Sequence, residues 1–401
     1  MTTAPDTIVW QDKKRYLWLL GLIAPTALLL ILPIVWAMNR AGWQTASQAL
    51  FWIGPILVYV VLPLLDLRYG PDGQNPPDEV MERLENDRYY RYCTYLYLPF
   101  QYLSVVLGAY LFTASDVSWL GVEGSLSWPA KIGLALSVGV LGAVGMNAAH
   151  EMGHKRDSLE RWLSKITLAQ VCYGHFYIEH NRGHHVRVAT PEDPASARFG
   201  ETFWEYLPRS IWGGLRSAWQ LEAARLRRLD KSPWHLSNDV LNAWLMSVVL
   251  WGVLIAVFGP ALIPFVIIQA VYGFTMFETV NYVEHYGLLR QQTANGRYER
   301  CTPEHSWNSD HIVTNLFLYH LQRHSDHHAN PTRRYQTLRS IDGSPNLPSG
   351  YASLIGLTYF PPLWRKVMDH RVLAHYDGDI TRVNMQPRRR EKILARYGAA
   401  V

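Results

Sequence analysis

Long uncharged stretches alternate with mixed polar segments along this chain of 401 residues. A bilayer core of about 30 Å requires roughly 20 apolar residues in a helix. Soluble helices of that length normally keep a polar face. Four stretches of suitable length carry no charged residue and predict four membrane-spanning helices: residues 17–38, 41–65, 92–115 and 132–149.

A fifth uncharged stretch, residues 240–277, is too long for one span. As a single helix it would measure about 57 Å, almost twice the bilayer core. Gly259-Pro260 interrupts it near the middle, which favours two helices joined by a tight turn. The first span is too long for a signal peptide and lacks a small-residue cleavage site, so it is expected to stay in the protein. The pattern predicts an all-α membrane protein with six transmembrane helices.

The distribution of charge predicts the orientation of these spans. With six spans both termini share one side, and of the 38 Lys and Arg residues only Arg40 and Lys131 fall on the other side. Basic residues favour the cytoplasmic side, so both termini and the long polar segments are predicted to be cytoplasmic and to form a helical cap. The predicted organisation is residues 1–149 with spans one to four, a histidine-box region at 150–239, spans five and six at 240–285, and a C-terminal histidine-box region and tail at 286–401.

Composition narrows the possible functions. The net charge of +5 comes from 38 basic and 33 acidic residues, too balanced for a dedicated nucleic-acid surface. Cys93, Cys172 and Cys301 are isolated, which excludes a disulfide framework and a CxxC site and suggests a reducing compartment. The 16 histidines are the unusual feature, and most of them are clustered.

Two histidine clusters have helical spacing. The fourth span runs into HEMGH, where His150 and His154 stack on one helix face at the i, i+4 spacing that also occurs in zinc proteases. In EHNRGHH, His180 and His184 should share a face while His185 points about 100° away. One helix could then serve two metal ions.

Further histidines lie near the same membrane boundary. His285 ends the sixth span, and HLQRHSDHH supplies His320, His324, His327 and His328. Ten imidazoles exceed the needs of one ion, so we predict a dinuclear site; a zinc peptidase needs only three ligands. Imidazole suits zinc, copper and iron, so spacing leaves the metal open. The other six are predicted to be surface or hydrogen-bonded residues: His175, His235, His305, His311, His370 and His375.

Four segments around these histidines resemble the integral-membrane non-haem diiron desaturases and hydroxylases, and within them the bacterial alkane 1-monooxygenases. The segments are HEMGHKRD at 150–157, EHNRGHH at 179–185, NYVEHYGLLR at 281–290 and LQRHSDHHANPTRRYQTLR at 321–339. NYVEHYG is the most specific, because desaturase-like proteins share the histidine boxes without it. The resemblance extends from Asp12 to about Asp369.

The resemblance implies two iron ions and a set of ligands. The implied ligands are His150, His154, His180, His184, His185, His285, His324, His327 and His328, with His320 outside the set. Carboxylates beside the boxes would orient the imidazoles through their other ring nitrogen, or are simply solvated acids: Glu151, Glu179, Glu284 and Asp326.

The implied reaction is the O2-dependent hydroxylation of the terminal methyl of an n-alkane to a primary alcohol, in the bacterial inner membrane. The alkane would enter from the lipid into a channel between the spans, with Gly108 and Gly139 as candidate lining positions. One alternative is a related desaturase or an aromatic side-chain or fatty-acid hydroxylase. Another is a metal transporter, which would place ionisable residues in the middle of the spans and not at one end.

The electrons for this reaction must come from another protein. The chain has no flavin or haem motif, and three isolated cysteines cannot hold a four-thiolate iron. The resemblance implies an acidic rubredoxin, supplied by a rubredoxin reductase. Its docking site is predicted at basic residues beside the histidine boxes, although the positive-inside bias alone would also place them there: Lys155, Arg156, Arg333, Arg334 and Arg339.

Overall fold

The computed structural model describes residues 10–398 and confirms the all-α class. No β-strand forms within this range, only isolated bridges. Six helical segments are long and apolar enough to cross a membrane: Arg15–Arg40, Gln44–Tyr69, Arg88–Thr113, Trp128–Gly153, Asp239–Phe258 and Pro260–His285. The six predicted spans are therefore confirmed, with ends shifted by a few residues.

Several spans consist of more than one helical piece. The first joins η1 (Arg15–Leu22) to α1 (Ile23–Arg40), and the third joins α6 (Arg88–Tyr95) to α7 (Tyr97–Thr113). The fourth and fifth are single helices, α8 (Trp128–Gly153) and α13 (Asp239–Phe258), and the sixth comprises η7 (Pro260–Leu262) and α14 (Ile263–His285). The second is the most irregular and contains α2 (Gln44–Ala49), η2 (Leu50–Trp52), α3 (Ile53–Ile56), η3 (Leu57–Val61) and α4 (Leu62–Tyr69).

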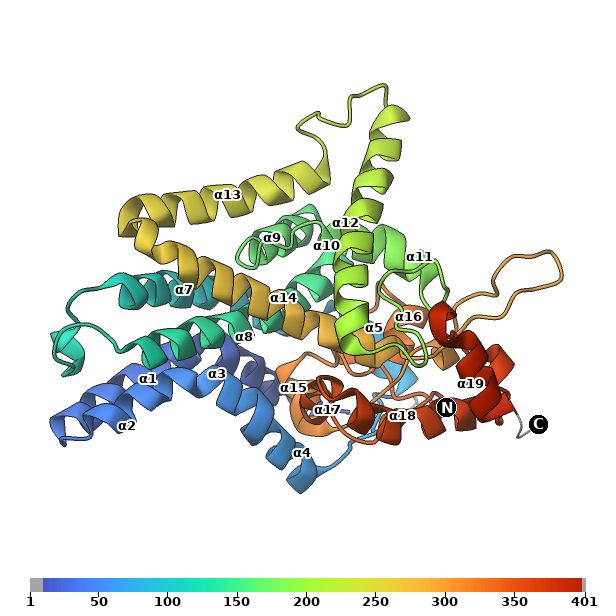
Figure 1. Ribbon diagram of the computed structural model, residues 1–401, viewed down its shortest axis with the longest axis horizontal. Coiled ribbons are helices and arrows are strands. Elements are labelled where there is room, and N and C mark those ends of the chain that lie inside the picture. The colour runs from blue at the N-terminus through green and yellow to red at the C-terminus, as the bar shows by residue number, and fades with distance from the viewer. Residues whose placement is uncertain (1–9, 399–401) are drawn as a thin grey trace, which may run out of the picture.

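The predicted break between spans five and six is present. Gly259 has φ +82°, a backbone conformation that favours glycine, and Pro260 starts the next helical turn with a ring that already fixes its φ. The two helices therefore form an antiparallel hairpin, visible as α13 and α14 in Figure 1.

Helix α8 lies at the centre of the bundle and packs most extensively against α14. A Cβ at Gly139 would lie only 2.9 Å from the carbonyl oxygen of Gln269, so glycine is what lets these two backbones approach closely. Because α8 ends at Gly153 and α14 at His285, this packing brings two histidine-bearing helix ends together.

The remaining helices gather mainly around this end of the bundle, where α12 runs across the direction of the spans (Figure 1). They are α5 (Met81–Asn86), α9 (Ser158–Leu168), α10 (Phe176–Ile178), η6 (Glu179–His184), α11 (His185–Arg187), α12 (Phe203–Arg227), α15 (Ile312–Phe317), α16 (His324–Ala329), α17 (Tyr351–Thr358), α18 (Pro361–His375) and α19 (Arg390–Tyr397). Short 3-10 turns complete the described chain: η4 (Asp78–Val80), η5 (Ser118–Leu120), η8 (Pro303–His305), η9 (Tyr335–Thr337), η10 (Ile380–Arg382) and η11 (Pro387–Arg389).

Candidate metal centre

All nine histidines implied as ligands converge in two adjacent groups. One group contains five imidazoles and the other four, and within each group the candidate ligand atoms lie within 4.8 Å of one another. The five-histidine group is His150, His154, His180, His185 and His327, and the four-histidine group is His184, His285, His324 and His328.

The facing ring nitrogens lie at separations that a shared metal ion would accept. Four Nε2–Nε2 separations in the five-histidine group measure 2.9 Å (His150–His327), 3.0 Å (His154–His180), 3.0 Å (His180–His185) and 3.2 Å (His185–His327). Three in the four-histidine group measure 3.3 Å (His184–His328), 3.3 Å (His285–His324) and 2.9 Å (His324–His328). Two nitrogens bound to one ion at about 2.0–2.1 Å in a tetrahedral site lie about 3.3 Å apart, so both donor sets fit a shared cation.

The protonation states also suit metal binding. Burial first, and neighbouring imidazoles second, hold the pKa of His180, His185, His324, His327 and His328 well below the usual histidine value. These rings are therefore neutral at pH 7, the form in which imidazole binds a metal.

The second histidine box departs from the predicted register. Residues Glu179–His184 form a π-helix, whose hydrogen bonds join residue i to residue i+5. His180 consequently meets His185 in the five-histidine group, while His184 joins the other group. His180 and His184 therefore belong to different groups although their ring centroids lie 5.2 Å apart, and this helical segment contributes to both groups.

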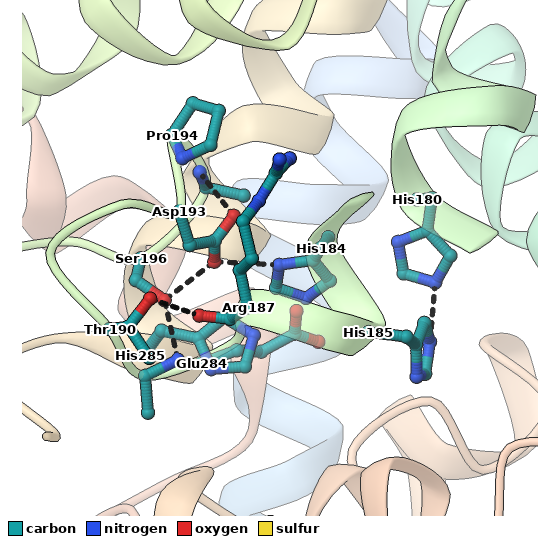
Figure 2. Close-up of polar contacts among 12 residues, drawn as sticks. His180, His184, His185, Arg187, Thr190, Asp193, Pro194, Ser196, Glu284 and His285 are labelled. Atoms are coloured by element: carbon teal, nitrogen blue, oxygen red, sulfur yellow. Dashed lines mark hydrogen bonds and ion pairs between the residues drawn. The ribbon is translucent and has the colours of Figure 1, made fainter. Parts of the chain in front are cut away.

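Asp193 is a partner of the site that the sequence analysis missed. Figure 2 shows its carboxylate Oδ2 accepting a hydrogen bond of 2.8 Å from His184 Nδ1 and one of 2.6 Å from Ser196 Oγ. Burial raises the pKa of Asp193, but the interactions with His184 and Ser196 outweigh it and the pKa lies below its usual range. The ionised carboxylate therefore fixes the ring of His184 with Nε2 directed at the group. No local motif marks Asp193, which lies in a loop nine residues after His184.

The four acidic residues predicted beside the boxes have different surroundings. Glu284 Oε2 lies 3.2 Å from His324 Nε2, so it faces the ligand nitrogen and not the other ring nitrogen. Glu179 pairs with Arg187 at 2.6 Å, and burial raises its pKa to about 7. Glu151 pairs with Lys155 at 3.0 Å, and Asp326 with Arg333 at 2.7 Å. Only Glu284 and the unpredicted Asp193 contact a ligand ring directly.

Histidine 320 lies outside both groups. Its Nδ1 donates a 2.8 Å hydrogen bond to the carbonyl of Tyr335, and its ring packs edge-on against Trp18 with 4.6 Å between centroids. The six histidines predicted to be surface or hydrogen-bonded residues also belong to neither group within residues 10–398. Among them, His175 lines a polar cavity beside the site.

Most of the basic residues predicted to receive the electron donor already have acidic partners. Lys155 is buried against Glu151, Arg334 binds Glu160 at 2.8 Å, and Arg333 and Arg339 bind Asp326 and Asp78. Arg156 is exposed. The structure thus gives four of the five residues a role in holding the loop after the last box.

A narrow apolar cavity approaches the histidines from within the bundle. Val140, Ala143 and Asn147 line it from α8, and Met276 and Val280 from α14. Asn147 lies three residues before His150, and the amide of Asn147 donates to the carbonyl of Leu318 at 2.7 Å, which satisfies it. The cavity is therefore almost entirely apolar up to the first turn before the ligands.

The two glycines suggested as channel positions do not line this cavity. A Cβ at Gly108 would meet Phe265 and Val138 at 3.1 Å, and one at Gly139 would meet the α14 backbone. Both glycines instead allow close helix packing. Spans one, two, four and six surround this cavity together with α15 and α17, and the third span contributes no lining residue.

A second, small cavity, lined by several polar side chains, lies on the other side of α14. It reaches His180 and His184, and its wall includes the buried carboxylate of Glu278. This carboxylate accepts hydrogen bonds from Tyr173 Oη at 2.9 Å, Tyr206 Oη at 3.0 Å and Ser210 Oγ at 2.7 Å. Helix α14 therefore separates an apolar approach to the histidines from a polar one.

Comparison with known proteins is consistent with this architecture. The fatty acid desaturase family model matches residues 126–358, which include all nine histidines of the two groups. An alkane 1-monooxygenase of Acinetobacter baylyi is 46% identical over 391 residues, covering 96% of this chain and 92% of that protein. The chain belongs to the alkane 1-monooxygenase family.

Two further relatives, one in this family and one more distant, are also similar to the chain. An alkane 1-monooxygenase of Pseudomonas putida is 43% identical, covering 99% of this chain and 94% of that protein. The xylene/toluene monooxygenase hydroxylase component XylM of Pseudomonas putida is 27% identical over 86% of this chain and 89% of that protein. The chain is thus an oxidoreductase of the alkane 1-monooxygenase type, with a multi-pass membrane fold and a histidine-rich candidate metal site.

Proposed function

We propose that this protein hydroxylates the terminal methyl group of n-alkanes to primary alcohols, using O2 and two electrons at a diiron centre. The observation that carries the proposal is that an almost entirely apolar cavity ends one turn before His150 and His324, which belong to the two groups of imidazoles. An unactivated hydrocarbon offers no polar group to bind, so only an apolar cavity can hold it near the metals. Higher identity to alkane 1-monooxygenases than to the xylene/toluene relative favours an alkane over an aromatic side chain.

The nine histidines would hold two irons, one in each group. Iron held there would supply the activation of O2 and the abstraction of a hydrogen atom from the alkane. Asp193 holds His184 in the orientation that directs Nε2 into the four-histidine group. The apolar side chains of α8 and α14 exclude water from the hydrocarbon side.

The protein would lie in the bacterial inner membrane with both termini and the histidine end in the cytoplasm. Only Arg40 and Lys131 lie at the far ends of the spans, as the positive-inside rule favours. A reducing cytoplasm also suits the three free cysteines.

A rubredoxin, with its reductase upstream, would deliver the electrons where the site comes nearest to the surface. His154 and His185 are partly exposed, whereas all four members of the other group are buried. Arg156 lies two residues after His154 and is exposed, which makes it the best of the predicted docking residues. Lys155, Arg333, Arg334 and Arg339 have acidic partners and would contribute less.

The proposal is tested with the purified protein in lipid nanodiscs, supplied with rubredoxin, rubredoxin reductase, NADH and a medium-chain alkane under 18O2. We expect two irons per chain and a 1-alkanol that carries one 18O atom. An alkene product would support the desaturase alternative, and turnover of toluene but not alkane would support an aromatic side-chain hydroxylase. Iron-free protein with full activity would contradict the diiron centre.

A further inference from the structure

Helix α12 presents three chemically distinct faces. One face packs on the bundle through Phe203, Tyr206, Ser210, Gly214 and Ala218, which recur at helical spacing and are buried. Tyr206 and Ser210 on this face donate to the carboxylate of Glu278, and Gly214 lines the polar cavity beside the histidines. The position of α12 therefore affects the surroundings of the metal site.

A second face of α12 is apolar, with Trp204, Pro208 and Trp212 exposed and Leu215 and Trp219 half-buried. Trp204, Pro208, Trp212, Leu215 and Trp219 recur every three or four residues and fall within a sector about 80° wide. Trp204 and Trp212 are 55% and 70% exposed. This face continues into the loop after α12, where Trp234 packs on Trp219 with 4.9 Å between ring centroids and is 72% exposed.

The third face of α12 is polar. Arg209, Gly213, Arg216, Ser217 and Gln220 line an open depression together with the charged loop 187–198. Arg209 also binds Glu201 at 2.7 Å. This face is suited to water, and its centre lies about 125° around the helix from that of the tryptophan face.

The position of α12 relative to the spans indicates what covers the tryptophan face. The helix runs across the spans at their histidine end (Figure 1). Trp204 stacks on Tyr359 and donates a 3.2 Å hydrogen bond to its carbonyl oxygen, and the Tyr359 hydroxyl lies 3.2 Å from that of Tyr59 in the second span. The tryptophan face thus continues directly onto a membrane-spanning helix, and exposed Phe360 extends it.

We propose that α12 lies in the plane of the membrane surface, with its tryptophan face in the boundary between lipid headgroups and acyl chains. Tryptophan is enriched at this depth because its ring is apolar while its N–H remains a hydrogen-bond donor. An amphipathic helix lying on a bilayer buries one apolar face and leaves its polar face in water. Lipid would then hold α12 in place over the polar cavity that reaches His180 and His184.

Site-directed spin labels in nanodiscs test this proposal independently of the catalytic reaction. Labels are attached to Pro208→Cys and Leu215→Cys on the tryptophan face, and to Gln220→Cys on the polar face, in a full-length protein with its three cysteines replaced by serine. Leu215 and Gln220 lie about 140° apart around the helix. Val249→Cys on α13, whose side chain is exposed on a span, and Glu192→Cys in the polar loop serve as lipid and water references.

We expect the ratio of O2 to nickel-chelate accessibility to be several-fold higher at Pro208 and Leu215 than at Gln220, approaching the value at Val249. Because two positions report on the tryptophan face, failure of one variant to fold leaves the other. Nickel accessibility at both positions equal to that at Glu192 would show that this face is in water and overturn the proposal. Shielding from both reagents would show that another protein surface covers it, which would overturn the proposal as well.

Discussion

The two histidine groups differ in size, exposure and polar support. The five-histidine group takes ligands from α8, the second histidine box and α16, and two of its rings, His154 and His185, reach the surface. The four-histidine group is wholly buried and is the one that carboxylates contact, through Asp193 on His184 and Glu284 on His324. The comparison teaches that the larger group of imidazoles lies nearer the surface, while the smaller group is enclosed and is held by carboxylates behind or beside its rings.

The largest expected effect follows from removing a ligand from the smaller group. His285→Ala leaves three imidazoles, whereas His154→Ala leaves four in its own group. We expect His285→Ala to abolish alkane hydroxylation. It should also weaken retention of one metal by more than about 100-fold, because loss of a residue that only supports a ligand already lowers metal affinity by up to about 100-fold. The metal content after dialysis measures this retention, and His320→Ala, which should keep both metals, is the control. Equal metal loss from His285→Ala and His154→Ala would remove the distinction between the groups.

The carboxylate behind His184 should have the next largest effect. Asp193→Asn removes the charge that opposes Nδ1 and should lower metal affinity by about 10- to 100-fold. The adjacent Glu192→Gln, which changes an exposed carboxylate, is the matched control. Competition with a chelator gives the affinities, and an Asp193→Asn variant with unchanged affinity would mean that the hydrogen bond alone is sufficient.

The apolar cavity between α8 and α14 provides a third test, because its walls lead to ligands of both groups. Ala143→Leu adds three carbons to the wall one turn before Asn147, and we expect it to shift the ratio of short-chain to long-chain alkane turnover by about tenfold. Product analysis with mixed alkanes measures the ratio. Leu126→Ala changes a buried residue that does not line the cavity, so it should leave the ratio unchanged.

The smallest effect concerns the exposed side of the five-histidine group. Arg156→Glu should slow rubredoxin-driven turnover a few-fold at low ionic strength and less at high ionic strength, since rim charges act mainly on the association rate and are screened by salt. Arg40→Glu, at the opposite ends of the spans, is the control for charge alone. Stopped-flow measurement of the rate at which rubredoxin reduces each variant, at several salt concentrations, compares Arg156→Glu with Arg40→Glu. Equal slowing by both variants would argue against docking near His154.

The sequence by itself determined the six spans, the break at Gly259-Pro260 and the nine clustered histidines, because these depend on local hydrophobicity, local backbone preference and residue type. Only the tertiary structure decided how the histidines divide. His184 and His185 are adjacent in the chain yet belong to different groups, as do His327 and His328. Helical spacing already separates His184 from His185, but the grouping of His180 with His185 depends on a π-helical turn and long-range packing, which spacing on an ideal α-helix does not reveal.

The surroundings of the site were likewise decided in three dimensions. Glu278 acquires its contacts from residues distant in sequence, whereas Asp193 reaches His184 across a short loop, and nothing in the adjacent residues distinguishes either from a solvated acid. The sequence suggests Gly139 as a channel position, but in the structure α8 and α14 can approach each other there only because glycine has no Cβ. Local sequence specifies which side chains can bind a metal or cross a membrane, whereas the side chains they face depend on packing between segments far apart in the chain.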